Sequence, residues 1–259
     1  MNVGLIGDFQ HSGSDRSSTP EAGVAGPDSP VLIQSHLLRQ QILSRTLDVV
    51  AGRPDRGFQL LGRGEAAIAT GLARLESRTQ RSVRNMQRRV PFNPRNGLLE
   101  LNDRSERRGL QLELIVAPSA LRSNRLLTSL DPTVRIGPVA LPMLLVDDRL
   151  AVVPGPFDSN GDATAWLMRD AALLEQGRSL WFQTSALSTP SLADQDEPPL
   201  TTRQCLTACM LVEGAKDSQI ARRLDVSLRT VAADVDALAR VLQASCRADV
   251  ISKLCSSDL

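Results

Sequence analysis

Apolar residues recur at intervals of three and four along the first segment with a regular pattern, residues 31–50. This spacing predicts an amphipathic helix, which ends where Gly52 and Pro54 follow. A second helix is predicted over residues 64–82 on the same grounds. The apolar stripe of the first helix, expected to face the core, consists of Leu38, Ile42, Leu43, Thr46, Leu47 and Val50.

From residue 82 onwards the apolar residues gather in short runs that are typical of strands, with helical stretches between them. The predicted strands lie within 82–87, 110–118, 133–137 and 141–155, and the helical stretches cover 98–109 and 120–130. Strands that alternate with helices predict an α/β domain built around a sheet.

Two further features belong to this domain. Asp147 and Asp148 divide the run 141–155 into two apolar halves, which predicts a hairpin turn between buried strands. A last helix, predicted over residues 164–187, closes the domain. Trp166 and Trp181 within it are expected to pack in the core rather than to stack on a ligand.

Two segments have no periodic apolar positions. Residues 1–30 are rich in Gly, Ser, Pro and Asp, and they cannot bury enough surface to offset the entropy of ordering, which predicts a disordered tail. Residues 188–199 contain three prolines and three acidic residues, a composition typical of a linker. The predicted organisation is a tail at 1–30, an α/β domain at 31–187, this linker, and a C-terminal domain at 200–259.

Composition limits the class of protein. Lysine and arginine together number 30 and the acidic residues 29, so contact with nucleic acid must come from a local basic patch. The sequence has no signal-like apolar segment and no apolar run near the roughly eighteen residues of a membrane span, which predicts a cytoplasmic protein without membrane contact.

The four cysteines all lie in the last quarter of the chain, and Cys205 and Cys209 are spaced to share one helix face. A zinc site made of cysteines alone needs four thiolates that converge from short loops. We therefore expect free thiols in a reducing compartment, with no metal and no cofactor.

The C-terminal 60 residues have the pattern of a helix-turn-helix unit. A first helix begins at Thr201 or Thr202 and ends before Gly214, and Asp217 is expected to cap a short second helix. A three-residue turn then leads to a third helix capped by Ser227. This geometry places the third helix in the major groove of DNA.

The stretch IARRLDVSLRTV, with LTTRQ before it and SCRAD after it, resembles the four-helix DNA-binding domain of LuxR-type transcription regulators. The resemblance implies a DNA-binding regulator that is not an enzyme and works as a homodimer on double-stranded DNA. It implies dimerisation through the fourth helix, at Val250, Ile251 and Leu254. The residues expected to contact DNA are Arg222, Arg223, Ser227, Arg229, Thr230, Ala232, Ala233 and Arg240.

The start of the recognition helix departs from the family pattern, in which basic or polar residues follow the Thr-Val pair. Here Ala232 and Ala233 can touch a thymine methyl group but cannot donate a hydrogen bond. The carboxylates of Asp234 and Asp236 would be repelled by phosphates, and a salt slope of only about −3 to −5 per monomer is expected. The alternative is therefore a protein-interaction module with weak or no DNA binding, which pairs with a related regulator.

The first domain resembles the sensor-like half of actinobacterial LuxR-type regulators, related to the phospholipase D-like fold and to TrmB-type regulators, through RSVRNMQ, RRGLQLELIVAPSAL and VRIGPVALPMLLVDDRLAVVPG. The resemblance implies a mixed sheet flanked by helices. Active phospholipase D enzymes have the pattern HxKxxxxD, whereas this chain has Leu141 and Met143 at the His and Lys positions and retains only Asp148.

This domain is accordingly expected to be non-catalytic and to bind a small molecule, a protein or a second subunit. The resemblance also suggests a role in specialised metabolism or development. An anion site is an alternative to a plain solvated surface for the arginines Arg84, Arg88, Arg89, Arg122, Arg125 and Arg149.

Overall fold

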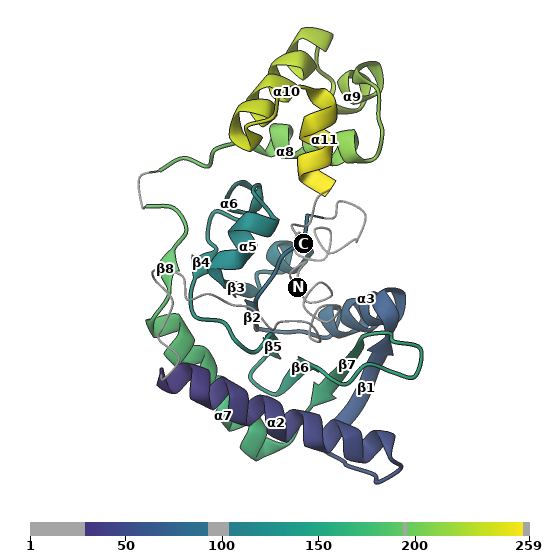
Figure 1. Cartoon of the computed structure of the whole chain (residues 1–259), viewed down its shortest axis with the longest axis vertical. Coiled ribbons are helices and arrows are strands. Elements are labelled where there is room, and N and C mark those ends of the chain that lie inside the picture. The colour runs from purple at the N-terminus through teal and green to yellow at the C-terminus, as the bar shows by residue number, and fades with distance from the viewer. Residues whose placement is uncertain (1–28, 93–103, 194–195, 256–259) are drawn as a thin grey trace.

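An eight-stranded mixed sheet occupies the first part of the chain in the computed structural model, which describes residues 29–92, 104–193 and 196–255 (Figure 1). The strand order is β1-β7-β6-β5-β2-β3-β4-β8. The pairs β2–β3 and β3–β4 are parallel and all others are antiparallel. The bounds are β1 Phe58–Arg63, β2 Ser82–Gln87, β3 Gln111–Val116, β4 Arg135–Ile136, β5 Met143–Val146, β6 Leu150–Pro154, β7 Thr164–Met168 and β8 Thr189–Pro190.

Helices cover both faces of this sheet. On one face α2 (Pro30–Val50) and α7 (Ala171–Ala186) lie against each other and enclose a core that contains Trp166 and Trp181 (Figure 1). On the other face α3 (Gly64–Glu76), α5 (Pro118–Ser123) and α6 (Leu127–Leu130) bury a second core around Ile68 and Leu72. The predicted α/β domain with a mixed sheet flanked by helices is confirmed, as is the core position of both tryptophans.

The predicted hairpin turn is also confirmed. Asp147 and Asp148 have φ values of 52° and 57°, and the Arg149 N–H donates to the Val146 carbonyl at 3.0 Å. Aspartate tolerates this left-handed conformation better than most residues because its short polar side chain can bond locally. The Asp147 carboxylate instead forms long-range bonds, accepting from the backbone N–H groups of residues 80, 81 and 82 at 2.7–3.0 Å.

Several elements differ from the sequence-based expectation. Residues 164–168 form the strand β7 and not the start of a helix, which begins only at Ala171. All five residues of β7 are buried, so the run has neither the period of a helix nor that of a half-exposed strand. The sequence pattern predicts neither of the two edge strands, β1 and β8, and β8 lies within the segment expected to be a linker. Of the helical stretch expected at 98–109, only residues 104–109 are described, and 104–107 are helical.

The outer side of α2 also differs from expectation. Leu38, Ile42 and Thr46 are buried as predicted, with at most 1% of each exposed. The other three members of the predicted core stripe point outward, with 41% of Leu43, 46% of Leu47 and 61% of Val50 exposed. The sheet covers only one side of the helix. Where apolar residues extend beyond that side, they remain exposed.

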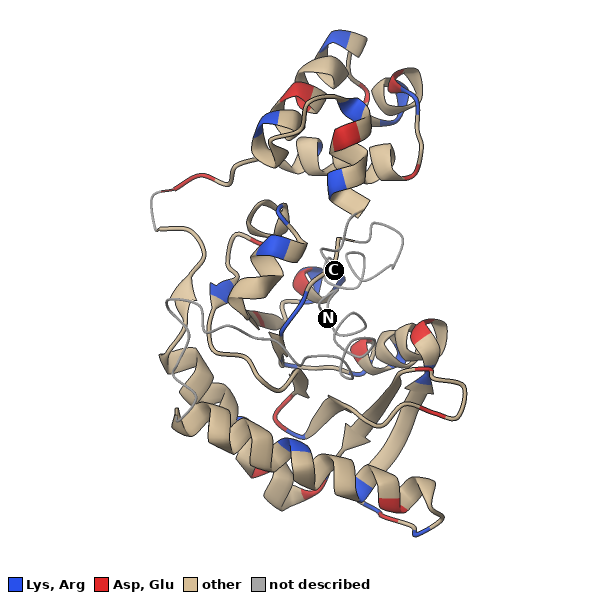
Figure 2. Ribbon diagram, in the orientation of Figure 1, with Lys and Arg blue, Asp and Glu red and all other residues tan. Residues whose placement is uncertain are grey.

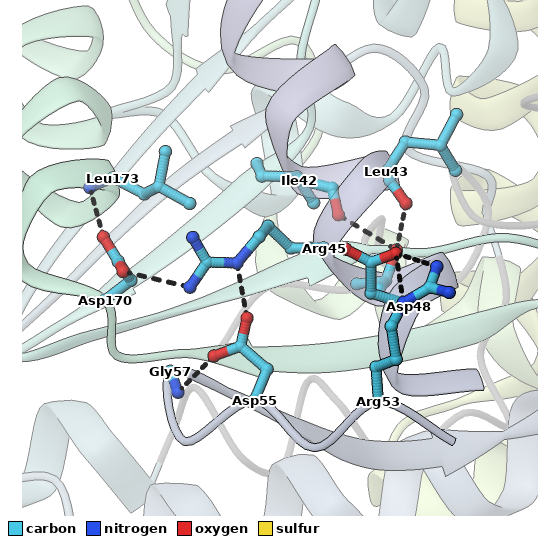
Figure 3. A network of polar contacts seen from close by, with 10 residues as sticks. Ile42, Leu43, Arg45, Asp48, Arg53, Asp55, Gly57, Asp170 and Leu173 are labelled. Carbon is cyan, nitrogen blue, oxygen red and sulfur yellow. Dashed lines mark hydrogen bonds and ion pairs between the residues drawn. The ribbon is translucent and has the colours of Figure 1, made fainter. Parts of the chain in front are cut away.

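Charged residues of both signs occur on the sheet domain and on the C-terminal helices, as the near-equal totals imply (Figure 2). Several of them form ion pairs that fix elements in place, and one such network holds α2 (Figure 3). Arg45 of α2 donates to the carboxylate of Asp55, and to that of Asp170 at 3.4 Å. Asp170 in turn caps α7 by accepting from the Leu173 N–H at 3.0 Å. The hydrogen bond from Arg45 lowers the pKa of Asp55.

Candidate nucleic-acid interface

Four helices follow the sheet domain: α8 Thr202–Val212, α9 Asp217–Leu224, α10 Leu228–Leu242 and α11 Arg247–Cys255. They confirm the predicted all-α C-terminal domain. Thr201 and Gln204 form a reciprocal capping box at the start of α8. Gly214, with φ of 82°, follows its end. The shared core consists of Leu200, Cys205, Ala208, Met210, Leu211, Ile220, Ala221, Val231, Ala237, Leu238, Leu242, Val250 and Leu254.

The turn between α9 and α10 is the predicted three-residue connection. It begins with Asp225, which has φ of 53°, and ends with Ser227, whose hydroxyl accepts the Thr230 N–H at 3.0 Å. Asp217 is not the cap of α9, because the preceding Lys216 occupies that position. The Asp217 carboxylate instead pairs with Arg247 at the start of α11. This contact ties α9 to α11 while the turn fixes α10 against α9.

The residues expected to contact DNA lie along the end of α9 and the outer side of α10. Thr230 is half-buried and the other seven are exposed: Arg222, Arg223, Ser227, Arg229, Ala232, Ala233 and Arg240. Arg223 lies 3.8 Å from a Glu213 oxygen. Arg222 and Arg229 have no hydrogen-bonding or ion-pair partner among the described residues. These two guanidinium groups are therefore available to an external anion.

The structure corrects the expected position of Asp234. Its side chain is 1% exposed and accepts two hydrogen bonds from Arg203 of α8, at 2.9 and 3.0 Å. The Thr207 hydroxyl lies 3.4 Å from the same carboxylate. Asp234 follows the buried Val231 by three residues and precedes the buried Leu238 by four, a spacing that places all three on the inner face. Asp236 alone of the two carboxylates remains on the exposed side.

The three residues expected to mediate dimerisation lie on the inner side of α11. Val250 and Leu254 are buried in the core of their own domain, and Ile251 is half-buried against it. Val250 and Leu254 are thus occupied by packing within one chain. A dimer contact through α11 would have to use other residues of that helix.

The C-terminal helices also contact the sheet domain. Leu126 at the start of α6 is fully buried among the core residues of the C-terminal domain. The Leu200 N–H donates to the Ser129 hydroxyl at 3.1 Å, and Arg125 donates to the Leu242 carbonyl at 3.3 Å. Leu242 is the last residue of α10. The recognition helix is therefore held by the sheet domain at its C-terminal end, whereas its N-terminal end is exposed.

The positions compared with the phospholipase D pattern lie in the sheet domain. Leu141 and Met143 are buried among apolar side chains on the α2–α7 side of the sheet. Asp148 pairs with Arg84 at 2.6 Å, and Arg84 also binds Glu113 at 3.1 Å and lies over the ring of Phe182. These residues form packing and ion-pair contacts.

The six arginines considered for an anion site do not all come together. Arg84 lies beside Phe182 of α7, on one side of the sheet. Arg125 follows α5 on the opposite side, where it contacts the end of α10. A single anion site that uses all six is excluded by this arrangement.

Comparison with known proteins settles the nature of the four-helix domain. Residues 198–254 match the family model described as bacterial regulatory proteins, luxR family. These residues form a LuxR-family helix-turn-helix domain. The match confirms the resemblance seen in IARRLDVSLRTV, and this domain supports a role in DNA-binding transcription regulation. No curated protein sequence matches the chain.

Solved structures resemble the chain only remotely. They include the archaeal chromatin protein TrmBL2, described as showing a novel mode of DNA binding (10% identity, TM-score 0.39, 61% of this chain and 65% of that one). The phospholipase D family member Nuc from Salmonella typhimurium has 11% identity and a TM-score of 0.41 over 52% and 98% of the two chains. NucT from Helicobacter pylori has 11% identity and a TM-score of 0.42 over 51% and 96%. Likenesses this remote support no argument about function.

The described residues contain neither a membrane-spanning helix nor a cluster of metal ligands. None of their helices combines the length and apolar character needed to cross a membrane. Nor do His, Cys, Asp or Glu side chains gather there in a group that could bind a metal ion. The four cysteines are free thiols, of which Cys205 is buried.

Proposed function

We propose that this chain is a transcription regulator that binds double-stranded DNA through the end of α9 and the N-terminal half of α10. The observation that supports it best is the pair of exposed, unpartnered guanidinium groups, Arg222 and Arg229, on the LuxR-type domain. Arg222 lies in the last turn of α9 and Arg229 in the first turn of α10, whose remaining free N–H groups and helix dipole also favour a phosphate. Phosphate contacts of this kind set register and affinity.

Apolar side chains on the same surface would supply base contacts. Leu228, which is 58% exposed, and the exposed Ala232 and Ala233 all lie in the N-terminal half of α10. None of the three can bond a base edge, but each can pack against a thymine methyl group in the major groove. The proposed operator is therefore rich in A·T pairs where α10 lies. Since Asp234 is turned inward and paired, Asp236 is the one acidic residue of α10 that remains exposed.

A gel-shift series with the DNA upstream of the protein's own gene tests the proposal. Retardation is expected at about 50 mM salt and should weaken steeply by about 200 mM. Replacing both arginines with alanine (Arg222→Ala and Arg229→Ala) removes two phosphate contacts, so the salt slope should fall by about 2 per monomer. No retardation of the folded protein at the lower salt concentration would refute DNA binding.

A charge-matched control separates local contact from net charge. Arg74 and Arg78 are exposed on and just after α3 in the sheet domain. Their double alanine variant loses the same two charges far along the chain from the recognition helix. It is expected to bind DNA with an unchanged salt slope. Equal losses in both double variants would mean that the binding surface is misassigned.

A protein-interaction role is the second candidate. The exposed Ala232, Ala233 and Asp236 favour it, because these three side chains offer no hydrogen-bond donor to a phosphate backbone and suit a protein partner better. In this case the chain would bind a related regulator and modulate it. A folded protein that fails to bind DNA at about 50 mM salt but lowers the DNA affinity of a related regulator would establish this alternative.

The proposal includes a non-catalytic sheet domain that senses a ligand or joins subunits, in a homodimeric protein acting in the cytoplasm. The buried Leu141 and Met143 support it, since apolar side chains can neither attack nor bind a phosphodiester. Hydrolysis of bis(p-nitrophenyl) phosphate by the purified protein above the rate without protein would contradict it. Control of specialised metabolism or development is proposed as the biological setting.

A further inference from the structure

The exposed side of α2 has a second regular pattern besides the one that faces the core. Some of its exposed residues form a series, in which they follow one another at alternating intervals of three and four positions. These intervals average 3.5 residues, so the residues form one stripe along the helix, as in a coiled coil. All six members of the series, called the α2 seam here, are exposed: Ile33, His36, Gln40, Leu43, Leu47 and Val50.

The chemistry of this surface is unusual for a helix that faces water. Five large apolar residues on α2 are 41–61% exposed, namely Leu37 and the four apolar members of the seam. Arg39 is the single formally charged residue among the exposed positions of α2. Solvated helix faces are normally rich in charge, whereas the centres of protein interfaces are depleted in it.

The inner contacts of α2 hold this face outward. Leu38 and Ile42 are buried in the sheet domain, and the buried hydroxyls of Ser35 and Thr46 bond to carbonyls of their own helix. Arg45 is tied to Asp55 and Asp170 (Figure 3). Because these contacts fix the rotation of α2 about its axis, the seam cannot turn into the core of the same domain.

The seam is complementary to itself. When two copies of α2 are laid antiparallel, Ile33 faces Val50 of the other copy, His36 faces Leu47 and Gln40 faces Leu43. The residue numbers of each pair have the same sum, so all six positions align in one register around a two-fold axis between residues 41 and 42. An isologous interface requires this property. We propose that the α2 seam is a homodimer interface formed by two antiparallel α2 helices.

The size of the surface suits this partner. A helix of 21 residues is about 32 Å long. The five exposed apolar residues present roughly 500 Å², more than half of the about 800 Å² per partner in a stable interface. The polar Gln40 and His36 each face leucine in the proposed register. Polar residues within such a seam disfavour other registers at some cost in stability.

The inference deepens the proposed function, which calls for a dimer on DNA, but its first test needs no DNA. Sedimentation of the full chain at about 10 µM should give a dimer. The substitution Leu43→Glu places a carboxylate near the two-fold axis in both subunits, and should raise the dimer dissociation constant by at least about 100-fold. The circular dichroism spectrum should not change, because residue 43 is exposed within each subunit.

A matched control uses Leu187, which follows α7 and is 54% exposed outside the seam. The substitution Leu187→Glu makes the same chemical change and should leave the dimer intact. A monomeric wild-type protein at about 10 µM would overturn the proposal. So would a Leu43→Glu protein that remains a dimer, since the contact would then lie elsewhere, for example on α11.

Crosslinking tests the antiparallel register. Ile33→Cys and Val50→Cys are introduced into separate copies of a chain that also has Cys246→Ser and Cys255→Ser. When the two copies are coexpressed, a short thiol-specific crosslinker should join them. Neither copy alone should crosslink to itself. Self-crosslinking of the Ile33→Cys protein would indicate parallel helices and refute the register.

The outcomes for this proposal and for the proposed function can be distinguished. A seam-dependent dimer that does not bind DNA would uphold the interface and refute the regulator. DNA binding by a protein that stays monomeric would support the regulator and refute the α2 interface. The alanine variants at Arg222 and Arg229 should remain dimeric but bind DNA more weakly.

Discussion

The turn residue Asp147 allows a quantitative test of how the hairpin β5–β6 is held. Burial raises the pKa of its carboxyl group, but the three backbone N–H donors of residues 80–82 outweigh that effect, and the net pKa is lowered. The charged form is thus favoured in the folded state. Its contribution to stability is present above the unfolded pKa, near 4, and is lost as the pH falls through the lower folded value.

Two substitutions separate charge from backbone conformation. Asp147→Asn retains a residue that tolerates the positive φ and removes the charge, which should lower the free energy of unfolding by about 1–2 kcal/mol at pH 7. Asp147→Ala also removes the acceptor and strains the turn, so a loss of about 2–4 kcal/mol is expected. Urea denaturation followed by circular dichroism measures both, at pH 7 and near pH 3.

The pH dependence of the stability difference between wild type and Asp147→Asn shows whether the charge of Asp147 causes it. Near pH 3, below the unfolded pKa of about 4, the carboxyl group of the unfolded chain is largely protonated, so the difference in stability between wild type and Asp147→Asn should narrow. Asp225 provides the control, because it also has a positive φ but is exposed, and no described N–H donates to its side chain. Asp225→Asn should change stability little at either pH. If Asp147→Asn is as stable as the wild type at pH 7, or less stable by the same amount at both pH values, the charge of Asp147 does not hold the hairpin.

Further predictions concern the C-terminal domain. Asp234→Ala removes the buried carboxylate that Arg203 of α8 binds, and should lower the melting temperature by several degrees. Asp236→Ala, on the exposed face, should leave the melting temperature unchanged and tighten DNA binding a few-fold at low salt. A larger loss of stability in Asp236→Ala than in Asp234→Ala would mean that Asp236, and not Asp234, is the buried carboxylate. Burial raises the pKa of Cys205 and of Cys209 to about 11, with Glu213 adding to the rise at Cys209. A thiol reagent at pH 8 should therefore label the two exposed cysteines quickly and these two slowly, and four equally fast thiols would contradict their burial.

Sequence patterns predicted elements well where one face is buried and the other is wet. The helices α2 and α3 and the turn at Asp147 follow from such contrasts. The sequence pattern predicts a helix where the strand β7 lies, because burial on both sides removes the contrast on which periodicity depends. The burial of residues 164–168 on both faces of the sheet depends on the tertiary arrangement, which the local sequence pattern does not reveal.

The recognition helix illustrates a second limit. Its position and its exposed arginines follow from the motif, but Asp234 was expected to face DNA because its neighbours Ala232 and Ala233 do. Two signals could have placed it inside: its spacing from Val231 and Leu238, and the presence of Arg203 in α8, the first helix of the same domain. Since a buried carboxylate needs a partner, the pair becomes visible only when the distance between α8 and α10 is known.

The same ambiguity has a different outcome in α2. Leu43, Leu47 and Val50 were assigned to the core because their spacing fits one helical stripe, yet that stripe is too wide for the sheet to cover. In the proposed dimer they would be buried after all, against a second chain. Pairing would place two sets of DNA contacts on one particle and so raise affinity through effective concentration. A modest salt slope per monomer is then compatible with tight binding by the dimer, and Leu43→Glu should weaken DNA binding although residue 43 lies far from α10 in the chain.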